Sequence, residues 1–145
     1  MRAIAILTLC ALAGCAADAA DEACDLDAVE SLPTGNHNQG MSCIEGGCHD
    51  GGGPAPPWTA AGTLYADPDG TTPLPGGVIT LVDASGEVIE LVSTQNGNFY
   101  TDRELVFPLE ADAEGCAELR AMPTPVPAGS CNQGGCHASN RIHLP

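Results

Sequence analysis

The 145-residue sequence predicts an all-β fold, a small antiparallel β-sandwich with loop-rich Cys-His segments at both ends. The clearest evidence is two β-branched runs, Val78–Val82 and Val88–Val92, with turn residues between them. Asn96-Gly97, just after the second run, is a strong hairpin signal. Strand candidates recur about every ten residues and no segment has a helical period, which is typical of a sandwich.

The other expected strands follow from the same signals. A Gly/Pro-rich, linker-like stretch at 51–57 precedes the first of them, and turn-rich residues separate it from Val78–Val82. The additional strand candidates are residues 62–66, 98–100, 104–109 and 116–122. The expected sandwich therefore occupies 58–122.

The N-terminus has the pattern of an export signal. Arg2 precedes an apolar run at 3–13 that is too short to span a bilayer. Leu12-Ala13-Gly14-Cys15 resembles the lipobox of bacterial lipoproteins, which implies that 1–14 is a signal peptide and that Cys15 is lipidated. The alternative is an ordinary export signal cleaved nearby. Ala16, by the same resemblance, implies sorting to the outer membrane, and 15–33 is expected to be an acidic tether.

The charge balance restricts the partners. The chain has 4 Lys or Arg residues against 19 Asp or Glu residues, a formal net charge of −15. We therefore expect no binding to nucleic acid and no adsorption to anionic lipid. Attraction of basic partners and simple solubility are both compatible with this charge.

The eight cysteines fall into groups by position. Cys10 leaves with the signal and Cys15 takes the lipid, so six remain; three disulfides would be the default in an oxidising compartment. Cys24 and Cys116 belong to no motif. We expect them to form a disulfide, the alternative being two unpaired thiols.

The other four cysteines belong to a repeated motif. Residues 42–49 and 130–137 both read S-C-x-x-G-G-C-H, with six identities in eight positions. Each copy is a C-x4-C-H sequence with two glycines before the second Cys. Such a repeat indicates a selected local geometry.

The motif is similar to C-x-x-C-H, the attachment signature of c-type haem. Its wider spacing resembles a variant found in some multihaem cytochromes c, and the paired glycines supply the backbone freedom that the longer loop needs. The resemblance implies two covalently attached haems, each with an iron. Their thioether bonds would come from four cysteines, Cys43, Cys48, Cys131 and Cys136.

The four histidines of the chain all lie beside these motifs. The resemblance makes His49 and His137 the proximal iron ligands, and His37 and His143 the candidate distal ligands. Two alternatives use the same residues: a Cys/His metal site such as zinc, or local disulfide loops. Neither spacing nor composition says which distal histidine serves which haem.

A second resemblance covers roughly 58–110. PLPGGVITLVDASG, followed by STQNGNFY, resembles carboxypeptidase-regulatory-like or transthyretin-like β-sandwiches. The whole chain resembles small cytochrome-c-like lipoproteins, with 34–57 and 123–145 as the two haem-binding segments. If the sandwich brings its chain ends to one edge, the motifs lie side by side; the competing arrangement puts them at opposite ends.

These patterns predict an electron carrier rather than an enzyme. No nucleophile elbow or acid/base pair is evident. The expected protein is a lipid-anchored dihaem cytochrome, exported to the periplasmic or cell-surface face of the outer membrane, with redox proteins as partners. The alternatives are a noncatalytic, disulfide-stapled binding module and a Cys/His metal-binding lipoprotein.

Overall fold

The computed structural model describes residues 32–34, 37–115 and 118–144. The predicted signal peptide, Cys15, Cys24 and Cys116 lie outside these ranges. The described residues form strands, turns and loops and contain no helix, so the predicted all-β fold is confirmed.

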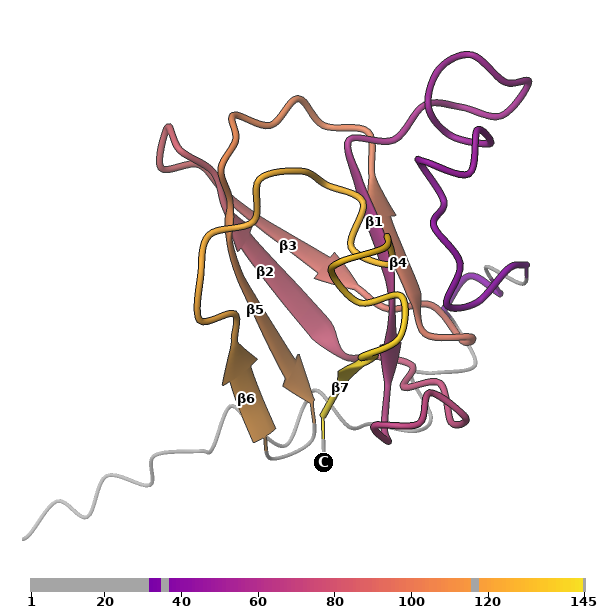
Figure 1. The fold of residues 1–145 in the computed structure, drawn as a ribbon. Coiled ribbons are helices and arrows are strands. Elements are labelled where there is room, and N and C mark those ends of the chain that lie inside the picture. Colours follow the sequence, from indigo (N-terminus) through magenta and orange to yellow (C-terminus); the bar gives the residue numbers. More distant parts are fainter. Residues whose placement is uncertain (1–31, 35–36, 116–117, 145) are drawn as a thin grey trace, which may run out of the picture.

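Seven strands form two sheets (Figure 1). One sheet has the order β4-β1-β7 and the other the order β3-β2-β5-β6. Neighbours run antiparallel except β1 and β7, which pair in parallel. The strands are β1 (Ala60–Tyr65), β2 (Val78–Val82), β3 (Val88–Val92), β4 (Asn98–Thr101), β5 (Glu110–Gly115), β6 (Glu118–Ala121) and β7 (Ile142–His143).

A single hydrophobic cluster joins the two sheets. Leu64 and Phe99 enter it from the first sheet, and Ile79 and Leu81 enter it from the second. Leu144, next to the C-terminus, is buried in the same cluster. The second Cys-His segment, 123–145, is therefore fixed to the core at its C-terminal end, because β7 and Leu144 belong to that end.

One strand prediction was wrong. Residues 104–109 form a loop, in which Leu109 makes an isolated bridge to Val126, and the strand follows as β5. The sequence of β5, EADAEG, has no large apolar side chain, yet it lies between β2 and β6. Its alternation of acidic and small residues fits a strand whose small side chains face the core.

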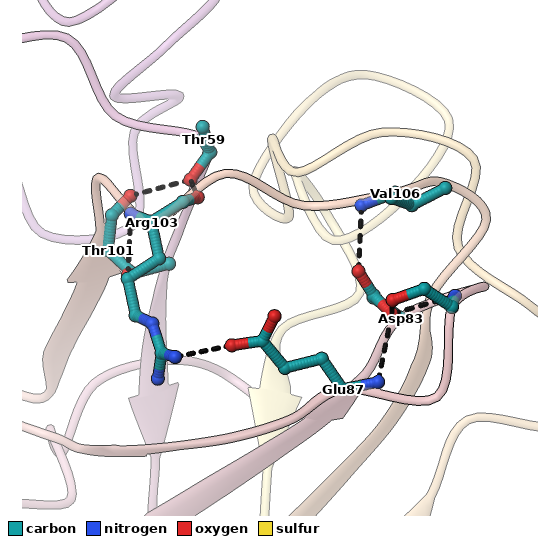
Figure 2. Close-up of polar contacts among 7 residues, drawn as sticks. Thr59, Asp83, Glu87, Thr101, Arg103 and Val106 are labelled. Atoms are coloured by element: carbon teal, nitrogen blue, oxygen red, sulfur yellow. Dashed lines mark hydrogen bonds and ion pairs between the residues drawn. The ribbon is translucent and has the colours of Figure 1, made fainter.

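The loop after β4 is held by polar contacts (Figure 2). Asp83 Oδ2, at the end of β2, accepts a hydrogen bond from the Val106 amide (3.0 Å). Arg103 forms an ion pair with Glu87, and the Thr59 hydroxyl donates to the Arg103 carbonyl. These contacts connect the loop to the turn between β2 and β3 and to the residue before β1 (Figure 2).

Strand β1 is the platform on which the Cys-His segments are built. All six of its residues are buried. Ala60 and Leu64 face the core, while Thr63 contacts residues of both Cys-His segments on the opposite face. A strand covered on both faces needs small or apolar residues throughout, which the sequence AAGTLY provides.

Candidate functional site

The two Cys-His motifs have the same local conformation. The His49 amide donates to the Cys43 carbonyl (3.1 Å), and the His137 amide donates to the Cys131 carbonyl (3.1 Å). The second glycine of each pair has a positive φ, 78° at Gly47 and 88° at Gly135. Glycine is suited to this turn because other residues rarely adopt that φ. The repeated sequence therefore folds into a repeated loop.

The second motif is joined to β1 through the backbone. The Ala61 amide donates to the Gly129 carbonyl (2.9 Å), and the Cys131 amide donates to the Ala61 carbonyl (3.0 Å). A Cβ atom at Gly129 would lie 1.8 Å from the Thr59 carbonyl oxygen. Only glycine therefore permits this close approach of the motif to the strand.

The first motif reaches the same strand by different contacts. The Thr63 hydroxyl, fully buried, accepts hydrogen bonds from the Gly40 amide (2.9 Å) and from Asn132 Nδ2 (3.1 Å), and donates to Asn98 Oδ1 (2.7 Å). Gly40 precedes the first motif and Asn132 belongs to the second. Thr63 is thus bonded to both segments at once.

The motifs lie side by side and contact each other through equivalent positions. The hydroxyl oxygens of Ser42 and Ser130 are 2.8 Å apart, although the residues are separated by 88 positions. At another equivalent pair, the Gln133 side-chain amide faces the Glu45 carboxylate, and with its nitrogen turned toward that carboxylate it donates to Glu45 Oε2 (2.8 Å). Contact between equivalent positions is the pattern of a local twofold relationship, as in an isologous interface. Of the two arrangements expected from the sequence, this is the one in which the motifs lie side by side.

The four motif thiols are free and differ in exposure. Cys48 and Cys136 are exposed, and Cys43 and Cys131 are half-buried beneath the loops. Burial raises the pKa of Cys131 to about 12, with smaller contributions from the thiols of Cys136 and Cys43. Burial, followed by the nearby Cys48 thiol, also raises the pKa of Cys43. Both inner thiols are therefore protonated at neutral pH.

His49 is held rigidly. Its ring is only 6% exposed and is stacked on Trp58, with centroids 3.4 Å apart and planes 8° apart. His49 Nδ1 lies 2.7 Å from the Pro56 carbonyl oxygen. Donation from Nδ1 to this carbonyl would leave Nε2 as the nitrogen with a free lone pair, the form of histidine that binds metals.

His37 lies beside His49. The two ring centroids are 6.3 Å apart and the planes differ by 25°. The His37 backbone carbonyl accepts a hydrogen bond from Asn98 Nδ2 (3.2 Å), which ties this residue to the first strand pair. The structure therefore places His37, one of the two candidate distal ligands, beside the histidine of the first motif.

The second motif borders a cavity of about 480 Å³. This size is within the range of small-molecule and cofactor sites, about 300–1,000 Å³. Four predicted site residues line the cavity together with core and loop residues: Cys131, Cys136, His137 and His143. The remaining lining includes apolar residues such as Ile79, Phe99, Val126 and Ile142.

His137 is oriented as His49 is. Its Nδ1 lies 2.7 Å from the Asn140 carbonyl oxygen, so the ring again presents Nε2 for binding. That Nε2 atom is 3.4 Å from Met122 Sδ. His143 has its Nδ1 atom 3.0 Å from the Arg141 carbonyl and lines the same cavity.

Sequence reasoning missed several residues that shape the site. Trp58 is only the first residue of the sandwich expected at 58–122, and the sequence does not mark Thr63 or Asn132 as polar contacts. Met122 is the last residue of the strand expected at 116–122, whereas β6 ends at Ala121. An aromatic residue placed soon after a Cys-His motif is the one signal that could have drawn attention to Trp58.

Two kinds of feature are absent from the described residues. In the ranges that the structure describes, no three His, Cys, Asp or Glu side chains are grouped so as to hold a metal ion. No helix within these ranges is long and apolar enough to cross a membrane.

The comparisons with known proteins gave no relative. No family model matches the chain, and neither the curated proteins nor the solved structures contain a match.

Proposed function

We propose that this protein is a lipid-anchored c-type cytochrome with two haems that transfers electrons in the periplasm or at the cell surface. The observation that carries the proposal is the pairing of two C-x4-C-H loops with the same backbone hydrogen bond, each of which orients its histidine through Nδ1. A zinc site or a disulfide loop does not require a histidine directly after the second cysteine. Covalent haem attachment does, because this histidine binds the iron beneath the ring.

The residues of the second motif fit a haem. Its two thiols and His137 line one side of a cavity whose other walls are largely apolar. A large, flat, apolar group with a central metal needs such a mixture of apolar walls and a few oriented polar ligands. The open face next to the exposed Cys136 gives that group a way in.

The first motif offers two histidines for the iron. His37 and His49, whose ring centroids are 6.3 Å apart, would hold the haem of this motif. Trp58 covers one face of His49 and leaves the edge of the ring as the route to Nε2.

Bound haem iron supplies one-electron redox chemistry. The protein's own residues hold and tune it. Cys43, Cys48, Cys131 and Cys136 would form the thioether bonds, and the carbonyls of Pro56 and Asn140 would keep the proximal imidazoles in one tautomer and orientation. The contact between the motifs, fixed at Ser42 and Ser130, keeps the two sites at a constant separation.

The location in the cell is proposed from sequence alone. The lipobox-like Leu12-Ala13-Gly14-Cys15 would give a diacylglyceryl anchor at Cys15, and Ala16 favours the outer membrane. Two acyl signals are enough for stable attachment without a spanning helix. An acidic cytochrome on such an anchor would exchange electrons with redox proteins that present a basic surface.

The test is an absorption spectrum and an intact mass of mature protein, produced in a host that attaches c-type haem. The proposal predicts a Soret band, a sharp α band on reduction, and a mass increase of two haems. The pair of substitutions Cys43→Ser and Cys48→Ser should remove one haem, and the pair Cys131→Ser and Cys136→Ser should remove the other. A colourless protein that has lost only thiol hydrogens would refute the proposal and favour the disulfide-stapled binding module. A colourless protein that retains zinc would favour the metal-binding lipoprotein.

A further inference from the structure

The contact between Met122 and the second motif points to an unequal pair of sites. This inference rests on the proposed function. We infer that Met122, rather than His143, is the second axial ligand of the haem at Cys131 and Cys136. The first site would have two histidine ligands and the second a histidine and a methionine.

Met122 lies close to the histidine of the second motif. Met122 Sδ lies 3.4 Å from His137 Nε2, the nitrogen that the Asn140 contact leaves for the metal. Both side chains line the cavity that also contains the motif thiols. Among the described residues, no hydrogen bond or ring contact joins His143 to His137; His143 Nδ1 contacts the Arg141 carbonyl instead.

A metal ion between Met122 Sδ and His137 Nε2 needs more room than the structure shows. With a nitrogen about 2 Å and a thioether sulfur about 2.3 Å from one metal ion, the two atoms are about 4.3 Å apart when they lie on opposite sides of it. The observed 3.4 Å would therefore have to widen by about 1 Å. Met122 is 37% exposed and comes directly after β6, where only its backbone amide is fixed, by the Ala111 carbonyl (2.8 Å). Its long, flexible side chain can make this movement.

A methionine ligand at the second motif would give the two sites different reduction potentials. Ligation by methionine and histidine raises the reduction potential of a c-type haem relative to other ligand sets. The site at Met122 would therefore have the higher potential, and the site at His37 and His49 the lower one. Electrons would move from the first motif to the second across the shared contact.

The experiment uses the haem-loaded mature protein and three variants. Met122→Leu removes the sulfur with little change in volume. His143→Asn removes the competing imidazole while keeping a donor for the Arg141 carbonyl. Met41→Leu is the matched control, because Met41 is 62% exposed and comes just before the first motif. Each protein is examined by redox titration and by the long-wavelength sulfur-to-iron absorption of its oxidised form.

We expect two separate potentials and the sulfur-to-iron band in the wild-type protein. Met122→Leu should abolish that band and shift the higher potential negative, while the other two variants keep both features. Treatment with a methionine oxidant, followed by peptide mapping, gives an independent readout: Met41 should be oxidised and Met122 protected by the bound iron. Loss of signal in His143→Asn with an unchanged Met122→Leu would overturn the inference and leave the dihaem proposal standing. Absence of haem by mass would overturn both.

Discussion

The hydroxyl oxygens of Ser42 and Ser130 lie 2.8 Å apart and join two loops that are 88 residues apart in the sequence. Each serine immediately precedes the first cysteine of its motif. The hydrogen bond is half-buried, and the Ser42 hydroxyl also accepts a bond from the Glu45 amide (3.1 Å). The pair therefore connects the internal structure of the first loop to the second loop.

Replacing either serine by alanine should destabilise the protein by about 1 kcal/mol, the usual net contribution of one hydrogen bond. The double variant should lose less than the sum of the single losses, because both substitutions remove the same bond. Urea unfolding of the single and double variants measures this coupling. Ser139→Ala is the control, since Ser139 is exposed in the same loop. Strictly additive losses would mean that the two hydroxyls do not interact in solution.

Thr63→Val should lower the free energy of unfolding more than either serine substitution does. The substitution keeps the shape of the side chain but removes the hydroxyl that bonds the Gly40 amide, Asn132 Nδ2 and Asn98 Oδ1. One net hydrogen bond contributes about 1 kcal/mol and a buried polar group that loses its bond costs about 1–3 kcal/mol, so we expect a loss of about 3 kcal/mol for the three bonds together. Chemical unfolding measures the loss.

Thr80→Val on β2 is the matched control, because Thr80 is half-buried in a strand of the other sheet. Its substitution should change the free energy of unfolding by less than about 1 kcal/mol. Equal effects at Thr63 and Thr80 would contradict the role of Thr63 as the shared contact of both segments.

The sequence predicted some strands well for a clear physical reason. The bounds of β2 and β3 match the expected Val78–Val82 and Val88–Val92. The reason is that β-branched residues favour strands, and the turn residues beside each run end the strand there. The turn expected at Asn96-Gly97 is present, with Gly97 at a φ of 78°, but the expected hairpin is wrong, because β3 and β4 on either side of the turn belong to different sheets. Strand β5 could not be predicted in this way, because its acidic and small residues acquire their place only from pairing with β2 and β6.

The sequence predicts candidate residues for the site, and their role stays a prediction, but it does not predict how they assemble. The motif repeat identified the cysteines and histidines, and the side-by-side arrangement, proposed from sequence as one of two options, is confirmed by the Ser42–Ser130 contact. The contributions of Thr63 and Met122 depend on contacts between residues 15 or more positions apart in the sequence. Contacts between residues so far apart leave no local sequence pattern, so they could not be predicted from the sequence.

Gly129→Ala should be strongly destabilising. The added methyl group would lie 1.8 Å from the Thr59 carbonyl oxygen and 2.8 Å from Ala60 Cα, so β1 or the second motif must move. We expect a loss of about 3 kcal/mol or more, because the clash is with backbone atoms that cannot rotate away. Thermal unfolding followed by circular dichroism provides the measurement.

Gly134→Ala, five residues later, provides the control. A Cβ atom there meets no atom within 4 Å, and its φ is not positive. The change should be neutral or slightly stabilising, because alanine has less freedom in the unfolded chain. A tolerated Gly129→Ala would mean that the second motif does not dock on β1 as closely as the structure has it.

The ionised carboxylate of Asp83 should stabilise the folded protein, and this stabilisation should be lost in acid. Hydrogen bonds from the Ser85 side chain and the Val106 amide, together with other amides of the same turn, hold the pKa of Asp83 at about 2, below its ordinary value of 3.8. The folded protein therefore favours the ionised carboxylate. This stabilisation is complete above pH 3.8 and is lost as the pH falls through about 2, because the unfolded chain binds the proton more readily.

The measurement is the free energy of unfolding in urea at several pH values between about 5 and 2. Asp83→Asn should lower stability at pH 5 and flatten the acid-induced decline, since the variant has no proton to bind at this position. Asp67, whose pKa the Thr71 amide and neighbouring groups also hold at about 2, should cause part of the decline that remains, and adding Asp67→Asn should flatten the curve further. An acid-induced decline as steep in Asp83→Asn as in the wild type would show that the bonds between the β2–β3 turn and the loop at Val106 do not stabilise the carboxylate.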